Sequence, residues 1–199
     1  MGGPGVLIHI GTHGLLPLVQ VGKLPHKAGV PGDQGAVRAA DIDETMDPEK
    51  PPFDEVARVS RSKALAVSRG EEDIVIAADT IVVCQGKVLG KPHSEAEAAS
   101  MLRLLSGRDH QVMTGCTILY GDRVETFTEV TSLHFRPLSE KEIQKYVQSG
   151  EPMDKAGAYG AQGYGALLIE GIEGDFFNVM GLPIRHLSCM LRKFHVPVL

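Results

Sequence analysis

This sequence of 199 residues lacks several features that mark particular classes of protein. Lysine and arginine together number 20 against 25 aspartates and glutamates, and the net charge of −5 leaves no basic surface for long nucleic acid. No apolar run approaches the ~20 residues that span a bilayer. The first residues carry no basic segment of the kind that opens a secretory signal. We therefore expect neither a membrane nor a long nucleic acid among its partners.

Cysteine is scarce as well. Cys84, Cys116 and Cys189 lie far apart, each among apolar residues, and no C-x-x-C pair or Cys/His zinc spacing is present. Buried, reduced thiols are the simplest interpretation of all three. Reduced thiols indicate a reducing compartment, so we expect a cytoplasmic protein.

The N-terminal region differs in composition from the rest of the chain. Residues 1–40 hold nine of the 23 glycines and four of the 12 prolines, and no serine occurs before Ser60. The remainder has the composition of an ordinary globular domain, with 43% hydrophobic and 23% charged residues overall. We expect an atypical Gly/Pro-rich segment over 1–40 and one domain over 41–199.

From Asp41 onward, strand and helix patterns alternate, which predicts the α/β class with a mixed sheet. Asp54, Ser94 and Ser139 are the expected helix N-caps, the last two with a glutamate three residues on. The Gly121-Asp122 pair predicts a hairpin turn. The expected helices are 54–69, 94–107, 139–150 and 182–194, and the expected strands are 73–78, 80–84, 87–89, 110–120, 123–135 and 164–172.

Asp79 is the strongest single candidate for chemistry. The apolar run 74–78 predicts a buried strand that ends by presenting the Asp79 carboxylate and the Thr80 hydroxyl. Lys91 follows on a loop that Gly90 and Pro92 flank. A desolvated acid and a fixed cation suit a site that handles phosphate and a metal ion. The alternative for Asp79 is a carboxylate that caps the next turn.

Other candidates are weaker when taken alone. Lys63 lies on the helix expected over 54–69, where a solvated lysine is the alternative. Glu44 ends an acidic run, DIDE, that supplies metal ligands or simply precedes a helix. Residues 150–165 are dense in glycine and contain Lys155 and Gln162, so they form a ligand-binding loop or a long irregular connection. No GxxxxGK[ST] phosphate loop is present.

Several strings, in this order, give the chain a resemblance to a known family. They are DIDE, SRSKALAV, IAADTIVVCQGKVLGKP, MLRLLSGRDHQVMTG, SEKEIQKYVQSGEPMDKAGAYGAQGYG and GDFFNVMGLPI. Together they resemble the Maf family of nucleoside triphosphate pyrophosphatases over about Ala40 to the C-terminus. The resemblance implies an elongated mixed β-sheet with flanking helices and a central nucleotide-binding cleft, related to the inosine triphosphate pyrophosphatases.

The resemblance also implies a reaction and the residues that perform it. A nucleoside triphosphate would be hydrolysed to the monophosphate and pyrophosphate with Mg²⁺ or Mn²⁺. Members that read DKAG followed by Gln-Gly resemble the dTTP/UTP branch, whereas the 7-methyl-GTP branch tends to have cysteine where Lys155 stands. The implied roles are proton acceptor for Asp79, metal binding for Glu44 and Asp79, triphosphate binding for Lys63 and Lys91, substrate binding for Lys155, and base selection for Thr80 and Gln162.

The chain departs from the family at its start. Members open with a strand and a Ser-x-Ser-x-Arg-Arg turn that contacts phosphate, whereas here no serine precedes Ser60 and Arg38 and Arg58 are the only arginines before it. We expect both strand and turn to be missing. Two alternatives therefore stay open: a catalytically impaired nucleotide-binding or regulatory protein, and a purine-specific ITP/XTP pyrophosphatase, which DKAG and AQG disfavour. A homodimer is also left open.

Overall fold

The structure is a computed structural model that describes residues 6–10, 36–37, 40–67 and 73–196. Most of the segment 1–40 lies outside the described residues, so the expected boundary at residue 40 stays a prediction. The chain divides into two compact units. The first comprises Met1–Asp79, Gly115–Thr128 and Ile184–Leu199, and the second comprises Thr80–Thr114 and Glu129–Pro183.

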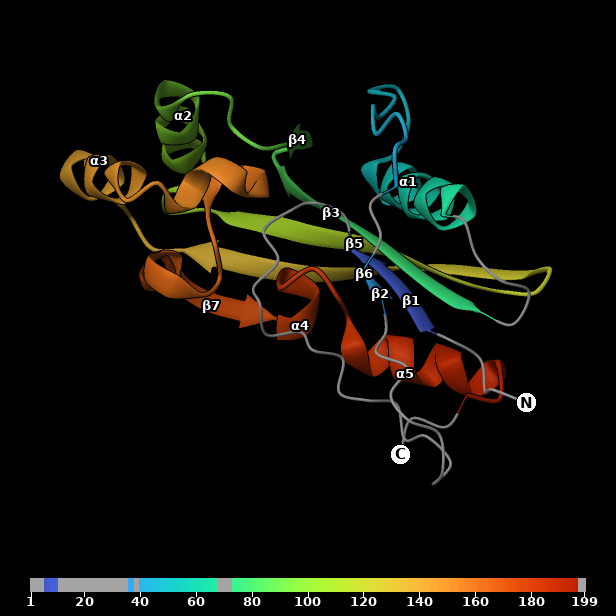
Figure 1. Cartoon of the computed structure of the whole chain (residues 1–199). Coiled ribbons are helices and arrows are strands. Elements are labelled where there is room, and N and C mark those ends of the chain that lie inside the picture. Colours follow the sequence, from blue (N-terminus) through green and yellow to red (C-terminus); the bar gives the residue numbers. More distant parts are fainter. Residues whose placement is uncertain (1–5, 11–35, 38–39, 68–72, 197–199) are drawn as a thin grey trace. The chain divides into compact units, whose positions relative to one another are not determined.

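The strands form one mixed sheet in the order β2-β1-β3-β5-β6-β7, with β4 paired to β3 (Figure 1). β1 is parallel to both β2 and β3, whereas the β3–β4 and β6–β7 pairs are antiparallel. The expected α/β class with a mixed sheet is confirmed. The strands are β1 (Val6–Ile10), β2 (Ala36–Val37), β3 (Ile74–Cys84), β4 (Lys87–Leu89), β5 (Asp109–Tyr120), β6 (Arg123–Phe135) and β7 (Ile169–Glu173).

The expectation that the first strand is missing is wrong. β1 lies beside β3 (Figure 1) and pairs with it in parallel, in a register that runs from Val6 opposite Ile74 to Ile10 opposite Ala78. Its sequence, VLIHI, is rich in the residues that favour strands, and a nearly continuous apolar run is typical of a parallel strand. Residues 11–35, where the serine–arginine turn would follow this strand, lie outside the described residues, so the expected absence of the turn stays a prediction.

In the first unit, two helices contact opposite faces of β6. Thr126 and Thr128 face α1 (Pro52–Ala66): the Thr126 hydroxyl bonds Thr117, which in turn bonds Ser60 of α1, and the Thr128 hydroxyl donates to the Phe53 carbonyl. Phe127 stacks on His186 of α5 (Ile184–Lys193), with the ring centroids 3.9 Å apart. Successive side chains of a strand point to opposite faces, so this alternation assigns one face to each helix.

The second unit has a larger apolar core. α2 (Glu95–Leu105) and α3 (Glu140–Gln148) pack against each other (Figure 1). Three short 3₁₀ helices, η1 (Glu151–Asp154), η2 (Ala156–Ala158) and η3 (Gly163–Leu168), precede β7, and α4 (Phe176–Val179) follows it. Fully buried residues of this core include Ala98, Leu102, Leu105, Phe135 and Ala158.

The two predicted N-caps that are followed three residues later by a glutamate, Ser94 and Ser139, are confirmed. Ser139 and Glu142 bond reciprocally in a full capping box. Ser94 accepts from the Glu97 N–H, but the Glu97 carboxylate accepts from the His93 N–H instead of the Ser94 N–H. The hairpin between β5 and β6 also turns where the Gly121-Asp122 pair predicts.

Four expectations about local structure are wrong. Pro51, not Asp54, is the N-cap of α1, since Pro52 with its fixed φ fits the first helical position. β3 continues through Asp79 without the expected break. Residues 163–168 are 3₁₀ helix, so the strand expected over 164–172 begins only at Ile169. Finally, Cys189 is exposed on α5, whereas Cys84 and Cys116 are buried, and all three are free thiols.

Among the helices of the described ranges, none combines the length and the hydrophobicity that a bilayer span requires. The cytoplasmic location stays a prediction.

His110 should make the stability of the fold depend on pH. Its side chain is buried, its Nε2 lies 2.8 Å from the Tyr159 hydroxyl, and burial lowers its pKa to about 4. The unfolded chain protonates this histidine near its ordinary value, so stability falls as the pH drops from about 6.5 to 4. We expect the unfolding free energy to decrease by about 2 kcal/mol more between pH 7 and pH 5 in the wild type than in His110→Gln. Urea unfolding at both pH values measures this, and equal decreases would contradict the assignment.

Candidate functional site

Lys63 occupies the centre of a buried charged cluster in the first unit. Its side chain is 0% exposed, and its ammonium lies 2.6 Å from Oδ1 of Asp79 and 2.9 Å from Oε1 of Glu44. Asp79 is 4% exposed and Glu44 is 36% exposed, so the cluster opens to solvent at Glu44. Three residues that the sequence singles out separately therefore meet here. The alternatives of a solvated Lys63 and of a turn-capping Asp79 are wrong.

Alternation along β3 places Asp79 under α1. Val75 and Ala77 pack against Ala64 of α1, and Asp79 is the next residue on the same face of the strand. On the helix, Lys63 lies on the same buried stripe as Val59, one turn before it, and Val56, two turns before it. The ion pair thus completes an interface that is otherwise apolar. An uncompensated charge there would be costly, so each partner requires the other.

Gly115 allows α1 to lie close to β5. A Cβ atom at this position would stand 2.3 Å from the Val56 carbonyl oxygen, closer than real atoms approach. Nearby, the Ser60 and Thr117 hydroxyls are hydrogen-bonded at 2.9 Å and both side chains are fully buried. The missing side chain of Gly115 therefore sets the separation at which Lys63 reaches Asp79.

Gly115→Ala should disturb both stability and the cluster. The obstructing atoms belong to the helix backbone, so α1 has to move, and we expect a loss of about 1–3 kcal/mol, or a Tm several degrees lower. Turnover should fall as well, because Lys63 moves with the helix. Gly171→Ala is the matched control, since nothing lies within 4 Å of its added Cβ. Calorimetry with equal Tm values for the two variants would refute this role of Gly115.

Glu55 and Arg58 anchor the segment that carries Glu44. Arg58 donates to both Glu55 carboxylate oxygens and to the Thr45 carbonyl, and Glu55 Oε2 accepts from the Asp47 N–H. The Arg58 guanidinium lowers the pKa of Glu55 to about 2. Sequence reasoning missed both residues. Their spacing of three on a helix is a signal for an ion pair, but not for its bonds to a distant loop.

The remaining predicted site residues lie in the second unit. The Thr80 hydroxyl is 2.9 Å from that of Thr114, which in turn donates to the Asn178 carbonyl. The loops of Lys91 and Lys155 are joined, because the Gly157 N–H donates to the Gly90 carbonyl at 3.0 Å. Gln162 is half-buried, has an extended backbone and directly precedes η3.

Lys155 forms an ion pair with its neighbour Asp154 at 2.7 Å. This pair sits on the surface, since the Asp154 side chain is 63% exposed, and exposed pairs hold a lysine weakly. A phosphate oxygen is therefore able to compete for the ammonium group.

The carboxylates of the buried cluster fit a hard cation that takes some of its ligands from the protein and the others from a substrate. Mg²⁺ is usually held by one or two carboxylates, with substrate phosphates and water completing its octahedron. Glu44 and Asp79 supply two carboxylates around one point, the Lys63 ammonium. No group of three or more His, Cys, Asp or Glu side chains suited to a metal occurs in the described ranges. Two carboxylates fit a cation whose remaining ligands are phosphate oxygens and water.

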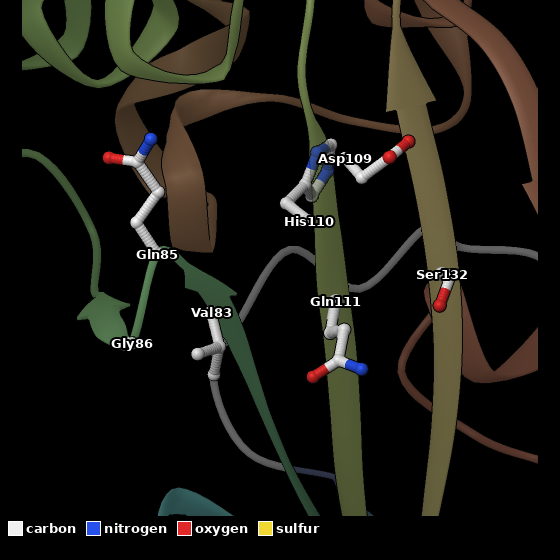
Figure 2. A pocket seen from close by; sticks show the side chains of 7 residues that line it. All are labelled: Val83, Gln85, Gly86, Asp109, His110, Gln111 and Ser132. Carbon is white, nitrogen blue, oxygen red and sulfur yellow. The ribbon is translucent and has the colours of Figure 1, made fainter.

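A separate hollow of about 270 Å³ opens in the second unit (Figure 2). None of the predicted site residues lines it. Its walls come from the end of β3, the β3–β4 turn, β5 and β6. Its described lining residues are Val83, Gln85, Gly86, Asp109, His110, Gln111 and Ser132. Because none of these described lining residues is a lysine or arginine that could bind a triphosphate, we do not assign the nucleotide to it.

The first unit thus contains a buried lysine between two carboxylates, and the second contains lysines on two joined loops, one of them rich in glycine. Groups of these kinds are suited to binding phosphate. Comparison with protein families gives the finer answer: residues 26–194 match the family described as Maf-like protein, and the chain belongs to this family.

Named relatives are similar over most of their length. The chain is 52% identical over 144 residues to a dTTP/UTP pyrophosphatase of Halalkalibacterium halodurans, which covers 72% of this chain and 76% of that protein. It is 47% identical to that of Bacillus velezensis over 81% of this chain and 86% of the relative. Identity to the Bacillus cereus enzyme is 44%, over 86% and 88% of the two chains.

Proposed function

We propose that this chain is a nucleoside triphosphate pyrophosphatase that hydrolyses dTTP and UTP to the monophosphate and pyrophosphate. The observation that carries the proposal is the buried cluster of Glu44, Lys63 and Asp79, in a family whose similar relatives are named dTTP/UTP pyrophosphatases. A buried lysine bonded to two acids is expensive to maintain for stability alone, because apolar residues would serve as well or better.

In the proposed reaction, Asp79 accepts a proton from the attacking water. The water oxygen bonds to the α-phosphorus, the bond between that phosphorus and the oxygen bridging to the β-phosphate breaks, and pyrophosphate leaves with the bridging oxygen. Charge develops on the non-bridging and departing oxygens, and positioned cations stabilise it. Lys63 and Lys91 supply that charge, while Lys63 also orients the Asp79 carboxylate.

The remaining roles concern the metal and the substrate. Glu44 and Asp79 would hold Mg²⁺ or Mn²⁺, which, when bound, neutralises phosphate charge as a Lewis acid. Lys155 would bind the substrate, and Thr80 and Gln162 would select the base. A neutral amide such as Gln162 matches the donor and acceptor edge of uracil and thymine, which differ only in a methyl group away from that edge.

Pyrophosphate release from dTTP, UTP, CTP, GTP, ITP and 7-methyl-GTP, each with Mg²⁺ or Mn²⁺, tests the proposal. We expect turnover of dTTP and UTP above all others, and none in Asp79→Asn. A preference for ITP would instead support a purine-specific enzyme. A folded protein that binds dTTP without hydrolysing it would support the nucleotide-binding alternative and point to the absent serine–arginine turn.

A further inference from the structure

Two side chains hold the glycine-rich segment 150–168 in shape. Glu151 lies at the start of η1, and its Oε2 accepts from the Tyr164 N–H at 2.9 Å while its Oε1 accepts from the Gly165 N–H at 3.0 Å. The Tyr146 hydroxyl of α3 donates to the same Oε1 at 3.0 Å and accepts from the Gly160 N–H at 3.0 Å. One carboxylate and one hydroxyl thus bond three backbone amides.

These three amides bracket Gln162. Gly160 stands two residues before it and Tyr164 two residues after it, so the chain is fixed on both sides of the residue. Between the anchors, Gln162 is extended, with φ −111° and ψ 165°. The bonds to Glu151 have an ionised acceptor, which makes them about twice as strong as neutral ones. We call Tyr146 and Glu151 the Gln162 clamp.

Gly165 shows how tightly the clamp closes. A Cβ atom there would lie 2.2 Å from the Gly160 carbonyl oxygen and 2.6 Å from the Tyr146 hydroxyl. The sequence suggests that these glycines make room for a ligand, but at Gly165 the approaching atoms belong to the protein itself. The backbone on the two sides of Gln162 is therefore in direct contact, and it forms a closed loop with Gln162 at its tip.

We propose that Tyr146 and Glu151 are positioning residues for base selection, which they achieve by fixing the Gln162 amide. This inference rests on the proposed function and names the part of the second unit that sets its pyrimidine selectivity. An amide distinguishes the edge of uracil or thymine from that of cytosine only if its oxygen and nitrogen stand in a defined place, within roughly 0.5 Å. A loop rich in glycine does not provide this by itself, since glycine leaves the backbone free.

Tyr146→Phe tests the clamp, with Tyr159→Phe as its matched control. Both tyrosines are 5% exposed and each loses one bonded hydroxyl, but the Tyr159 hydroxyl bonds His110 on β5 instead of the loop backbone. We expect Tyr146→Phe to lower the ratio of kcat/KM for dTTP over dCTP at least tenfold, mainly through a higher KM for dTTP. The ratio for Tyr159→Phe should stay within twofold of the wild type.

A second measurement tests whether the clamp holds the backbone, and it does not depend on catalysis. Amide hydrogen exchange of Gly160, Tyr164 and Gly165 should accelerate at least tenfold in Tyr146→Phe and stay unchanged in Tyr159→Phe. Glu151→Gln should accelerate exchange at Tyr164 or at Gly165, because an NH2 group replaces one of the two carboxylate oxygens and each oxygen accepts from one of these amides. Unchanged exchange, or the same change of the dTTP/dCTP ratio in both tyrosine variants, would overturn the proposal.

The two proposals fail in different ways. If the wild type binds dTTP but hydrolyses nothing, the pyrophosphatase function fails, and the dTTP/dCTP ratio of Kd, measured by calorimetry, takes the place of the kinetic ratio with the same expected tenfold change. If the wild type hydrolyses dTTP and Tyr146→Phe keeps its selectivity, only the clamp fails. A wild type that binds neither nucleotide overturns both.

Discussion

Asp79→Asn is expected to lower kcat for dTTP hydrolysis at least 10²-fold while leaving the Kd for dTTP within a few-fold. A carboxylate that accepts the proton of the attacking water contributes roughly 10²–10⁴-fold to the rate. Asparagine has nearly the same shape and still offers an oxygen to Lys63, so the α1–β3 interface should survive. Pyrophosphate release gives kcat, and calorimetry with a non-hydrolysable dTTP analogue gives Kd.

Asp109→Asn is the control for this substitution. The Asp109 side chain is 85% exposed and bonds only His134 among the contacts described, so the same chemical change should leave kcat within twofold. A near-normal rate in Asp79→Asn would remove Asp79 from the role of proton acceptor. A large loss of affinity instead of rate would make it a binding residue.

Lys63→Met should have a comparably large effect, on both stability and activity. Removing the ammonium leaves Asp79 buried and Glu44 half-buried without their shared cation, and breaking a buried pair costs about 3–5 kcal/mol. Turnover should also fall at least 10²-fold, since the positive charge that orients the Asp79 carboxylate is lost from the proposed site. Denaturant unfolding and pyrophosphate release measure the two effects.

Lys50→Met is the matched control for that variant. Lys50 is 56% exposed and pairs with Asp47 at 3.5 Å on the surface of the same unit, so its loss should change stability by less than about 0.5 kcal/mol.

The double variant Lys63→Met with Asp79→Asn distinguishes the structural role of the cluster from its catalytic role. It should recover part of the lost stability, because the buried carboxylate is gone too, and none of the activity. Recovery of activity would show that the cluster is only structural.

Parts of the fold follow from local signals in the sequence. Ser94 and Ser139 begin helices as predicted, because a hydroxyl followed three residues later by a glutamate satisfies the first backbone amides of a helix. The Gly121-Asp122 turn joins β5 and β6 as predicted. The strand end predicted before Asp79 is wrong. A carboxylate normally ends a buried strand, but here Lys63 compensates its charge and β3 continues.

The position of Lys63 on its helix is a sequence signal that argues against the solvated alternative. Lys63 stands four residues after Val59 and seven after Val56, on the stripe that packs inward. A lysine at such a position is buried only if acids reach it. Neither the distance of 16 residues to Asp79 nor the DIDE run shows by itself that they do.

The α/β class, the helix starts at serine caps and the hairpin could be predicted from the sequence, because they depend on groups within a few residues of one another. The structure was needed to show that Glu44, Lys63 and Asp79 form one buried cluster, and that Tyr146 and Glu151 close a loop around Gln162. Both arrangements depend on contacts between separate elements. The first requires α1 to lie against the sheet at Gly115, and the second requires backbone amides to converge on a single carboxylate.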